Sequence, residues 1–97
     1  MNEKIITINA IIQKKKGLTQ LPTPIAVRIF CKDQYAVATF SDPKLAKKLY
    51  EADAQNGKDV RYDSKLNVMV ERFKNKNAKE VATIVGQQMK KAGGTLQ

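Results

Sequence analysis

The sequence predicts a small α+β protein with five antiparallel strands and two helices. Two patterns support this prediction. Residues 4–40 contain three short segments rich in Ile, Val and Phe, and two later segments repeat apolar residues at helical spacing. The chain has 97 residues, of which 42% are hydrophobic and 28% are charged, as is typical of a globular domain. We therefore expect residues 1–97 to form a single domain.

The first strand is expected over residues 4–13, where isoleucines alternate with polar side chains. One parity of this strand is apolar and contains Ile6, Ile8, Ala10 and Ile12. A lysine cluster and Gly17 end the pattern. Residues 18–24 include Pro22 and Pro24, which exclude a helix and favour an extended loop.

The second and third strands are expected over residues 25–31 and 35–40, as a hairpin. An even loop would pair Cys31 with Ala36, Ile29 with Ala38, and Val27 with Phe40. One face of the hairpin is then wholly apolar, which favours this register over an odd loop. The opposite face carries Arg28, Phe30, Lys32, Tyr35, Val37 and Thr39.

A helix is expected after Asp42, whose side chain can cap the free amides, with Pro43 in the first turn and Asn56-Gly57 as the stop. Its apolar positions are Leu45, Ala46, Leu49, Tyr50 and Ala52. A second hairpin is expected from residues 60–62 and 66–73, with a turn at residues 63–65.

The last helix should begin at Asn77, because Glu80 three residues later completes a capping box. Gly93-Gly94 should end it, and we expect the three residues after them to fray. Its apolar stripe consists of Val81, Ile84, Val85 and Met89.

The order of three strands, a helix and two strands over residues 4–73 resembles the OB-fold, a small partly open barrel that often binds single-stranded nucleic acid. The resemblance implies a five-stranded antiparallel OB-like partly open barrel over about residues 4–73. The last helix, at about residues 78–92, would be an addition to it.

A second resemblance is local. Residues 34–40, Gln-Tyr-Ala-Val-Ala-Thr-Phe, followed by Ser-Asp-Pro-Lys-Leu-Ala, resemble the third strand and second helix of an RNA-recognition motif. Gln34 stands where that family has glycine, and Val37 where it has the central aromatic residue. Tyr35 is the residue to which the resemblance gives a base-stacking role.

The net charge and the residue composition exclude several classes of function. Eighteen basic residues against nine acidic ones give a net charge of +9, which favours an anionic partner. The chain has no histidine, only one cysteine and scattered glycines. These counts argue against common catalytic dyads, Cys or His metal sites and a phosphate-binding glycine loop. We expect no enzyme activity, no metal, no cofactor and no small-molecule substrate.

Other reactive groups have structural explanations. Asp33, Asp42 and Asp63 fall where turns or helix caps account for them. Cys31 lies in an apolar run and is interpreted as a small buried hydrophobe, with a reactive thiol as the alternative.

The function predicted is non-catalytic binding of single-stranded DNA or RNA with low sequence specificity, through a basic and aromatic sheet face and a lysine-rich loop. The candidate residues are Lys14, Lys15, Lys16, Arg28, Phe30, Lys32, Tyr35, Arg61 and Lys65. Each has a structural alternative: the lysines can be simply solvated, and Phe30 or Tyr35 can belong to the core.

A different class of function stays open. The apolar stripe of the last helix can pack on the sheet or on a second copy, and if the helix covers the Phe30 face the aromatic surface is lost. The protein is then an assembly module or homodimer, or binds an acidic protein partner. We find no signal peptide and no membrane-spanning stretch, and expect a cytoplasmic protein that binds no membrane.

Overall fold

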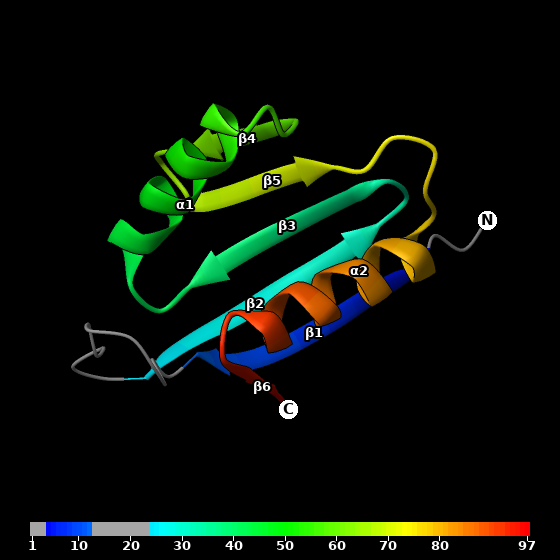
Figure 1. The fold of residues 1–97 in the computed structure, drawn as a ribbon, viewed down its shortest axis with the longest axis horizontal. Helices are drawn as coiled ribbons and strands as arrows, with labels where there is room; N and C mark the ends of the chain where they lie inside the picture. The colour runs from blue at the N-terminus through cyan, green and yellow to red at the C-terminus, as the bar shows by residue number, and fades with distance from the viewer. Residues whose placement is uncertain (1–3, 13–23) are drawn as a thin grey trace.

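The computed structural model describes residues 4–12 and 24–97. The elements, in chain order, are β1 (Ile5–Ile12), β2 (Ile25–Lys32), β3 (Tyr35–Phe40), α1 (Pro43–Gln55), β4 (Val60–Asp63), β5 (Val68–Arg72), α2 (Ala78–Lys91) and β6 (Gly94–Leu96). The strands form one antiparallel sheet in the order β4-β5-β3-β2-β1-β6 (Figure 1). The α+β class is therefore confirmed.

The sheet is open and has six strands, whereas the sequence predicted five strands in a partly open barrel. Strands β4 and β6 lie at its two edges and do not pair with each other. None of the strands from β1 to β5 contains a glycine, so these five strands lack the residue that most readily allows a sharp bend.

The sixth strand was missed because the last residues were expected to fray. Gly93 adopts a φ of 88°, a left-handed conformation that reverses the chain directly after α2. The next three residues then pair with β1, and the backbone amide of Gln97 donates a hydrogen bond of 2.8 Å to the carbonyl of Asn9. Strand β6 thus satisfies part of the free edge of β1.

The central hairpin has the predicted register. Cys31 pairs with Ala36, and Lys32 pairs with Tyr35 across a two-residue turn. Asp33 has a φ of 53° in that turn, a conformation that Asp tolerates better than most residues. The register places the apolar parity of β1, β2 and β3 on one face of the sheet.

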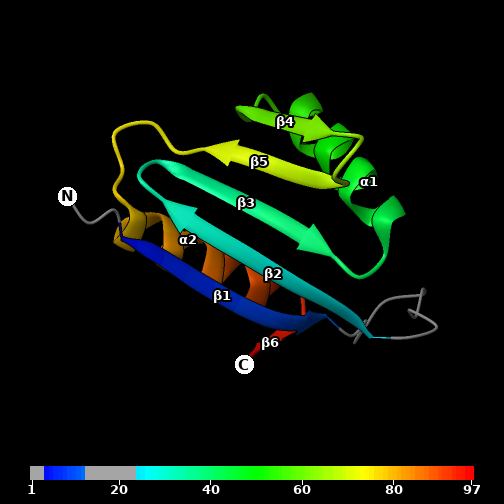
Figure 2. The ribbon, with the colours of Figure 1, turned by 180° about the vertical axis from the view of Figure 1, so that it is seen from behind.

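Both helices cover that apolar face, as Figures 1 and 2 show from opposite sides. The predicted caps are confirmed: Asp42 accepts a hydrogen bond from the amide of Lys44, and Asn77 and Glu80 form a reciprocal capping box. No helix in the described parts of the chain is long and apolar enough to cross a membrane.

The apolar stripe of α2 is used within the chain. Val81 and Val85 are buried in one cluster with Val27, Ile29 and Cys31 of β2. These two valines are therefore unavailable to a second copy of the protein. A homodimer through α2 would have to use other residues of the helix.

Helix α1 covers the other half of the sheet. Ala46 is fully buried, and the ring of Tyr50 stacks on that of Tyr62 in β4, with the ring centroids 5.9 Å apart. Ala52, predicted to be on the apolar side, is exposed, whereas Asp53 is half-buried and its carboxylate lies 3.7 Å from the ammonium of Lys58.

Candidate functional site

Neither of the two helices in residues 4–12 and 24–97 lies over one face of the sheet, and we call this the open face (Figure 2). Because successive side chains of a strand point to opposite faces, the register assigns to the open face every strand residue that does not face the helices. In β1, β2 and β3 these are Ile5, Thr7, Asn9, Ile11, Ala26, Arg28, Phe30, Lys32, Tyr35, Val37 and Thr39. In β4 and β5 they are Arg61, Asp63, Val68, Val70 and Arg72.

The register aligns these side chains in rows across the strands. One row places Phe30 of β2 beside Val37 of β3, followed by Val70 of β5 and Arg61 of β4. Phe30 lies between Thr7 of β1 and Val37 of β3 and is 38% exposed. The row therefore forms an apolar strip, with an accessible aromatic ring near one end and a guanidinium at the other.

The next row surrounds a second ring with positive charge. Tyr35 of β3 lies between Lys32 of β2 and Arg72 of β5, and its residue is 41% exposed. Phe30 is diagonal to Tyr35 on the neighbouring strand, at a typical separation of about 7–8 Å. Two accessible rings and two cations thus lie side by side on adjacent strands.

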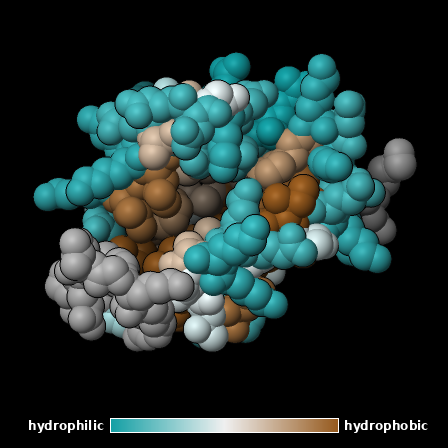
Figure 3. Space-filling model, viewed as in Figure 1, coloured by the Kyte–Doolittle hydropathy of each residue, from teal (hydrophilic) through white to brown (hydrophobic). Residues whose placement is uncertain are grey.

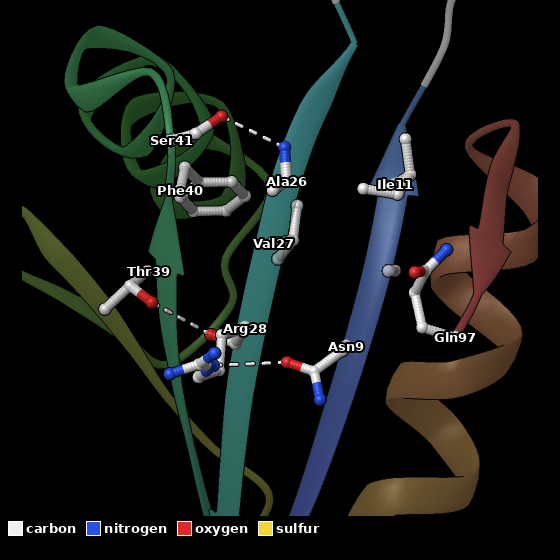
Figure 4. Close-up of a pocket in the computed structure, with 10 residues that line it drawn as sticks. Asn9, Ile11, Ala26, Val27, Arg28, Thr39, Phe40, Ser41 and Gln97 are labelled. Atoms are coloured by element: carbon white, nitrogen blue, oxygen red, sulfur yellow. Dashed lines mark hydrogen bonds between the residues drawn. The ribbon is translucent and has the colours of Figure 1, made fainter.

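A third row is polar and borders an open hollow of about 560 Å³ (Figure 4). In this row the Arg28 Nε donates a hydrogen bond of 3.2 Å to the Asn9 Oδ1, and the Thr39 hydroxyl donates one of 3.3 Å to the Arg28 carbonyl. The side chains of Arg28 and Asn9 point toward each other across β2 and β1. The bond to Asn9 holds the guanidinium close to the sheet surface.

A smaller hollow of about 140 Å³ lies at the β4 edge of the open face. Tyr35, Arg61, Val70 and Arg72 line it together with Asp59, whose carboxylate is 3.7 Å from the guanidinium of Arg72. Both side chains of this ion pair are exposed, so Arg72 stays accessible to solvent. Two guanidinium groups are therefore available at this end of the face.

The structure brings together five of the nine residues predicted from the sequence, all on the open face: Arg28, Phe30, Lys32, Tyr35 and Arg61. Lys65 lies in the turn between β4 and β5, outside the rows. Lys14, Lys15 and Lys16 lie outside the residues that the structure describes.

Sequence reasoning missed Arg72 and Asn9. The partner and register of β5 could not be read from its own residues, so nothing placed Arg72 beside Tyr35. Asn9 was assigned to the polar parity of β1, but its hydrogen bond to Arg28 depends on the β1–β2 register. Finding either residue would have required knowing which strands pair and in which register.

Cys31 and the carboxylates offer little reactive chemistry. The Cys31 side chain is fully buried, and burial raises the pKa of its thiol, which keeps it protonated. Within residues 4–12 and 24–97, no three Cys, Asp or Glu side chains gather in a way that could hold a metal ion.

The fold and its site thus define an α+β protein with one helix-covered sheet face and one accessible face that is basic and aromatic. The chain matches no family model, no curated protein and no solved structure.

Proposed function

We propose that the open face binds single-stranded nucleic acid, DNA or RNA, with low sequence specificity and without catalysis. The observation that supports this most is the position of Phe30 and Tyr35, two accessible rings on neighbouring strands with Lys32 and Arg72 beside Tyr35. Unpaired bases stack on such rings, and the cations neutralise the phosphates between them.

The shape of the face favours single strands over duplex. A duplex offers its bases only through its grooves, which helices or narrow ribbons usually enter. The open face presents a broad sheet surface, and both helices lie behind it. Unstacked bases can lie flat on such a surface, whereas a duplex would contact it mainly through phosphates.

The charge of the face favours a polyanion. Its strand residues include Arg28, Lys32, Arg61 and Arg72, against one strand carboxylate, Asp63, and Asp59 just before β4, which pairs with Arg72. The Asp63 carboxylate accepts hydrogen bonds from the backbone amides of Lys65 and Leu66 in the adjacent turn. Its charge is therefore partly satisfied by the protein itself.

The low specificity also follows from the side chains. Rings and cations recognise features that all nucleotides share. The proposal includes the OB-like interpretation of the fold, which the order of three strands, a helix and two strands supports. It also includes a cytoplasmic location.

The proposal is tested by fluorescence anisotropy with labelled single-stranded and duplex oligonucleotides across a salt series. We expect tighter binding of single strands, and a fall in log affinity of about 0.7 per contacted phosphate for each tenfold rise in salt. Absence of binding at low salt would reject the proposal, and equal affinity for duplex would reject the preference for single strands.

Sizing chromatography of the free protein addresses the assembly alternative. A stable oligomer that does not bind oligonucleotides would favour a protein–protein module. A monomer that binds single strands would favour the proposed function.

A further inference from the structure

A cleft lies between α1 and α2 on the helix-covered side of the sheet, far from the open face in the fold. It has a volume of about 250 Å³, with sheet residues as its floor and helix residues as its walls. Figure 3 shows apolar side chains gathered in a hollow on this side of the molecule. Ala36 and Ala38 contribute to the floor, and their small side chains leave the space between the helices unfilled.

The lining of the cleft is mostly apolar and adaptable. Leu49 of α1 and Met89 of α2 form opposite walls, and Met69 of β5 lies in the floor. Methionine side chains are flexible and polarisable, so they adjust to ligands of different shape. An open apolar cleft with a few polar groups is the usual form of a small-molecule site.

The main polar group inside the cleft is the carboxylate of Glu71 in β5, which faces the helices beside Met69. Its side chain has no ion pair or hydrogen bond among the described residues, although it is half-buried. Burial raises the pKa of Glu71; Lys58 lowers it, and Asp53 and Asp59 raise it. A half-buried carboxylate with no hydrogen bond, and with only a shared cation nearby, is costly, and a bound cation would relieve that cost.

The charged side chains near Glu71 do not provide it with a cation of its own. Lys58 is the cation at the rim of the cleft, and its ammonium already lies 3.7 Å from the carboxylate of Asp53. The cleft therefore holds two carboxylates against one ammonium, in a protein whose net charge is +9. This local reversal of sign selects a cationic ligand and disfavours the phosphates expected on the open face.

We propose that the cleft between α1 and α2 binds a small organic ammonium ion with an apolar body, such as an arylalkyl amine. The ammonium group donates hydrogen bonds to the Glu71 carboxylate, and the apolar body packs between Leu49 and Met89 above Ala38. Typical ligand pockets measure about 300–1,000 Å³, so a cleft of about 250 Å³ suits a small ligand. The sequence predicted no small-molecule substrate, and this ligand undergoes no reaction.

Three probes with one apolar body and different head groups test the proposal: 4-phenylbutylammonium, 4-phenylbutanol and 4-phenylbutyrate. Each is titrated into ¹⁵N-labelled protein, and amide chemical shifts are followed by NMR. We expect saturable shifts at cleft residues such as Ala38, Met69 and Met89, with the ammonium tightest and the carboxylate weakest. Shifts scattered over the surface, or the same affinity for all three probes, would overturn the proposal.

Two matched variants locate the contact. Glu71→Gln should weaken binding of the ammonium probe by about three- to tenfold and leave the alcohol unchanged, because it removes one charge-assisted contact. Glu51→Gln removes the same charge from an exposed position on α1 and should leave both affinities as in the parent. An equal effect of the two variants would show that only overall charge matters and would contradict the proposal.

A third variant tests the space itself. Ala38→Leu places a larger side chain in the floor of the cleft and should weaken all three probes while the circular dichroism spectrum is retained. Retained affinity in a folded Ala38→Leu variant would place the ligand elsewhere and overturn the proposal.

Discussion

Tyr35 and Phe30 show how a residue's role depends on the face to which the register assigns it. Both are large and apolar enough for a core, yet both are accessible because their strands turn Cys31 and Ala36 inward instead. Cys31 is fully buried and Ala36 nearly so. The helix-covered face thus receives the small side chains of the hairpin turn, and the aromatic rings remain on the open face.

The first prediction concerns the ring of Tyr35. Tyr35→Ala should weaken binding of a single-stranded oligonucleotide by about fivefold to a hundredfold, because stacking of one base contributes about 1–3 kcal/mol. The salt slope should stay unchanged, since no charge is removed. Tyr35→Phe keeps the ring and serves as the control, and both variants are measured by anisotropy. An alanine variant that binds like the parent would show that no base stacks on Tyr35.

The second prediction concerns the pH dependence of stability at Glu71. Its pKa is raised in the folded protein from an ordinary value of 4.5, so above that value the folded state binds more protons than the unfolded chain. The free energy of unfolding should therefore fall as pH rises through this window, and the loss should persist at neutral pH.

Glu71→Gln removes this pH-dependent loss of the free energy of unfolding. The variant should be more stable than the parent near pH 7, and the difference should disappear near pH 3.5, below the ordinary pKa of the carboxyl. Urea denaturation at the two pH values measures the difference, with Glu51→Gln as the exposed control. A stability difference that does not change with pH would refute the assignment.

At the scale of elements, local signals predicted both helices and the central hairpin. Asp42 and Asn77 cap the helices as their side-chain chemistry requires, and the alternation of apolar residues determined the β2–β3 register. The prediction that failed concerns the last residues, which were expected to fray. Strand β6 has only three residues, and its pairing depends on Gly93, Gly94 and the edge of β1 rather than on its own propensity.

The third prediction tests the packing of β6. A Cβ atom on Gly94 would lie 2.8 Å from the carbonyl oxygen of Met89 and 3.4 Å from that of Ile11, both backbone atoms. Gly94→Ala should therefore destabilise the protein by about 1–3 kcal/mol, as overpacking typically does. Thermal or urea unfolding measures the loss.

Gly86 provides the matched control. A Cβ there would lie 3.7 Å from the Leu96 Cδ1, an ordinary contact, within helix α2. Gly86→Ala should stabilise the protein by up to about 1 kcal/mol, because alanine has the higher helix propensity. If Gly94→Ala were as well tolerated as Gly86→Ala, β6 would not be packed as described.

At the scale of the whole molecule, the sequence predicted the composition of the open face better than its extent. The hairpin register placed Arg28, Phe30 and Tyr35 together because it depends on neighbouring segments. Arg72 joined them only through the β3–β5 pairing, which connects residues far apart in the chain. The sheet is open and has six strands, where five strands in a partly open barrel were predicted, and its extent likewise depends on long-range pairing.

The cleft between the helices illustrates the same limit. Glu71 and Met69 share one face of β5, and nothing local shows that two helices stand apart above that face. Only the assembled fold reveals that the covered face of the sheet is incompletely filled.

The central claim is that the open face, and not overall charge, binds single-stranded nucleic acid. It is tested most directly with two double variants that remove two positive charges each. Arg28→Gln with Arg61→Gln alters the open face, and Lys47→Gln with Lys48→Gln alters the exposed side of α1. Both reduce the net charge equally, and salt-dependent anisotropy is measured with one single-stranded oligonucleotide.

We predict that the arginine pair lowers affinity by about tenfold or more and reduces the salt slope by about 1.4, twice the value for one phosphate, whereas the lysine pair changes the slope little. Equal losses of affinity and slope in the two double variants would contradict a specific interface on the open face.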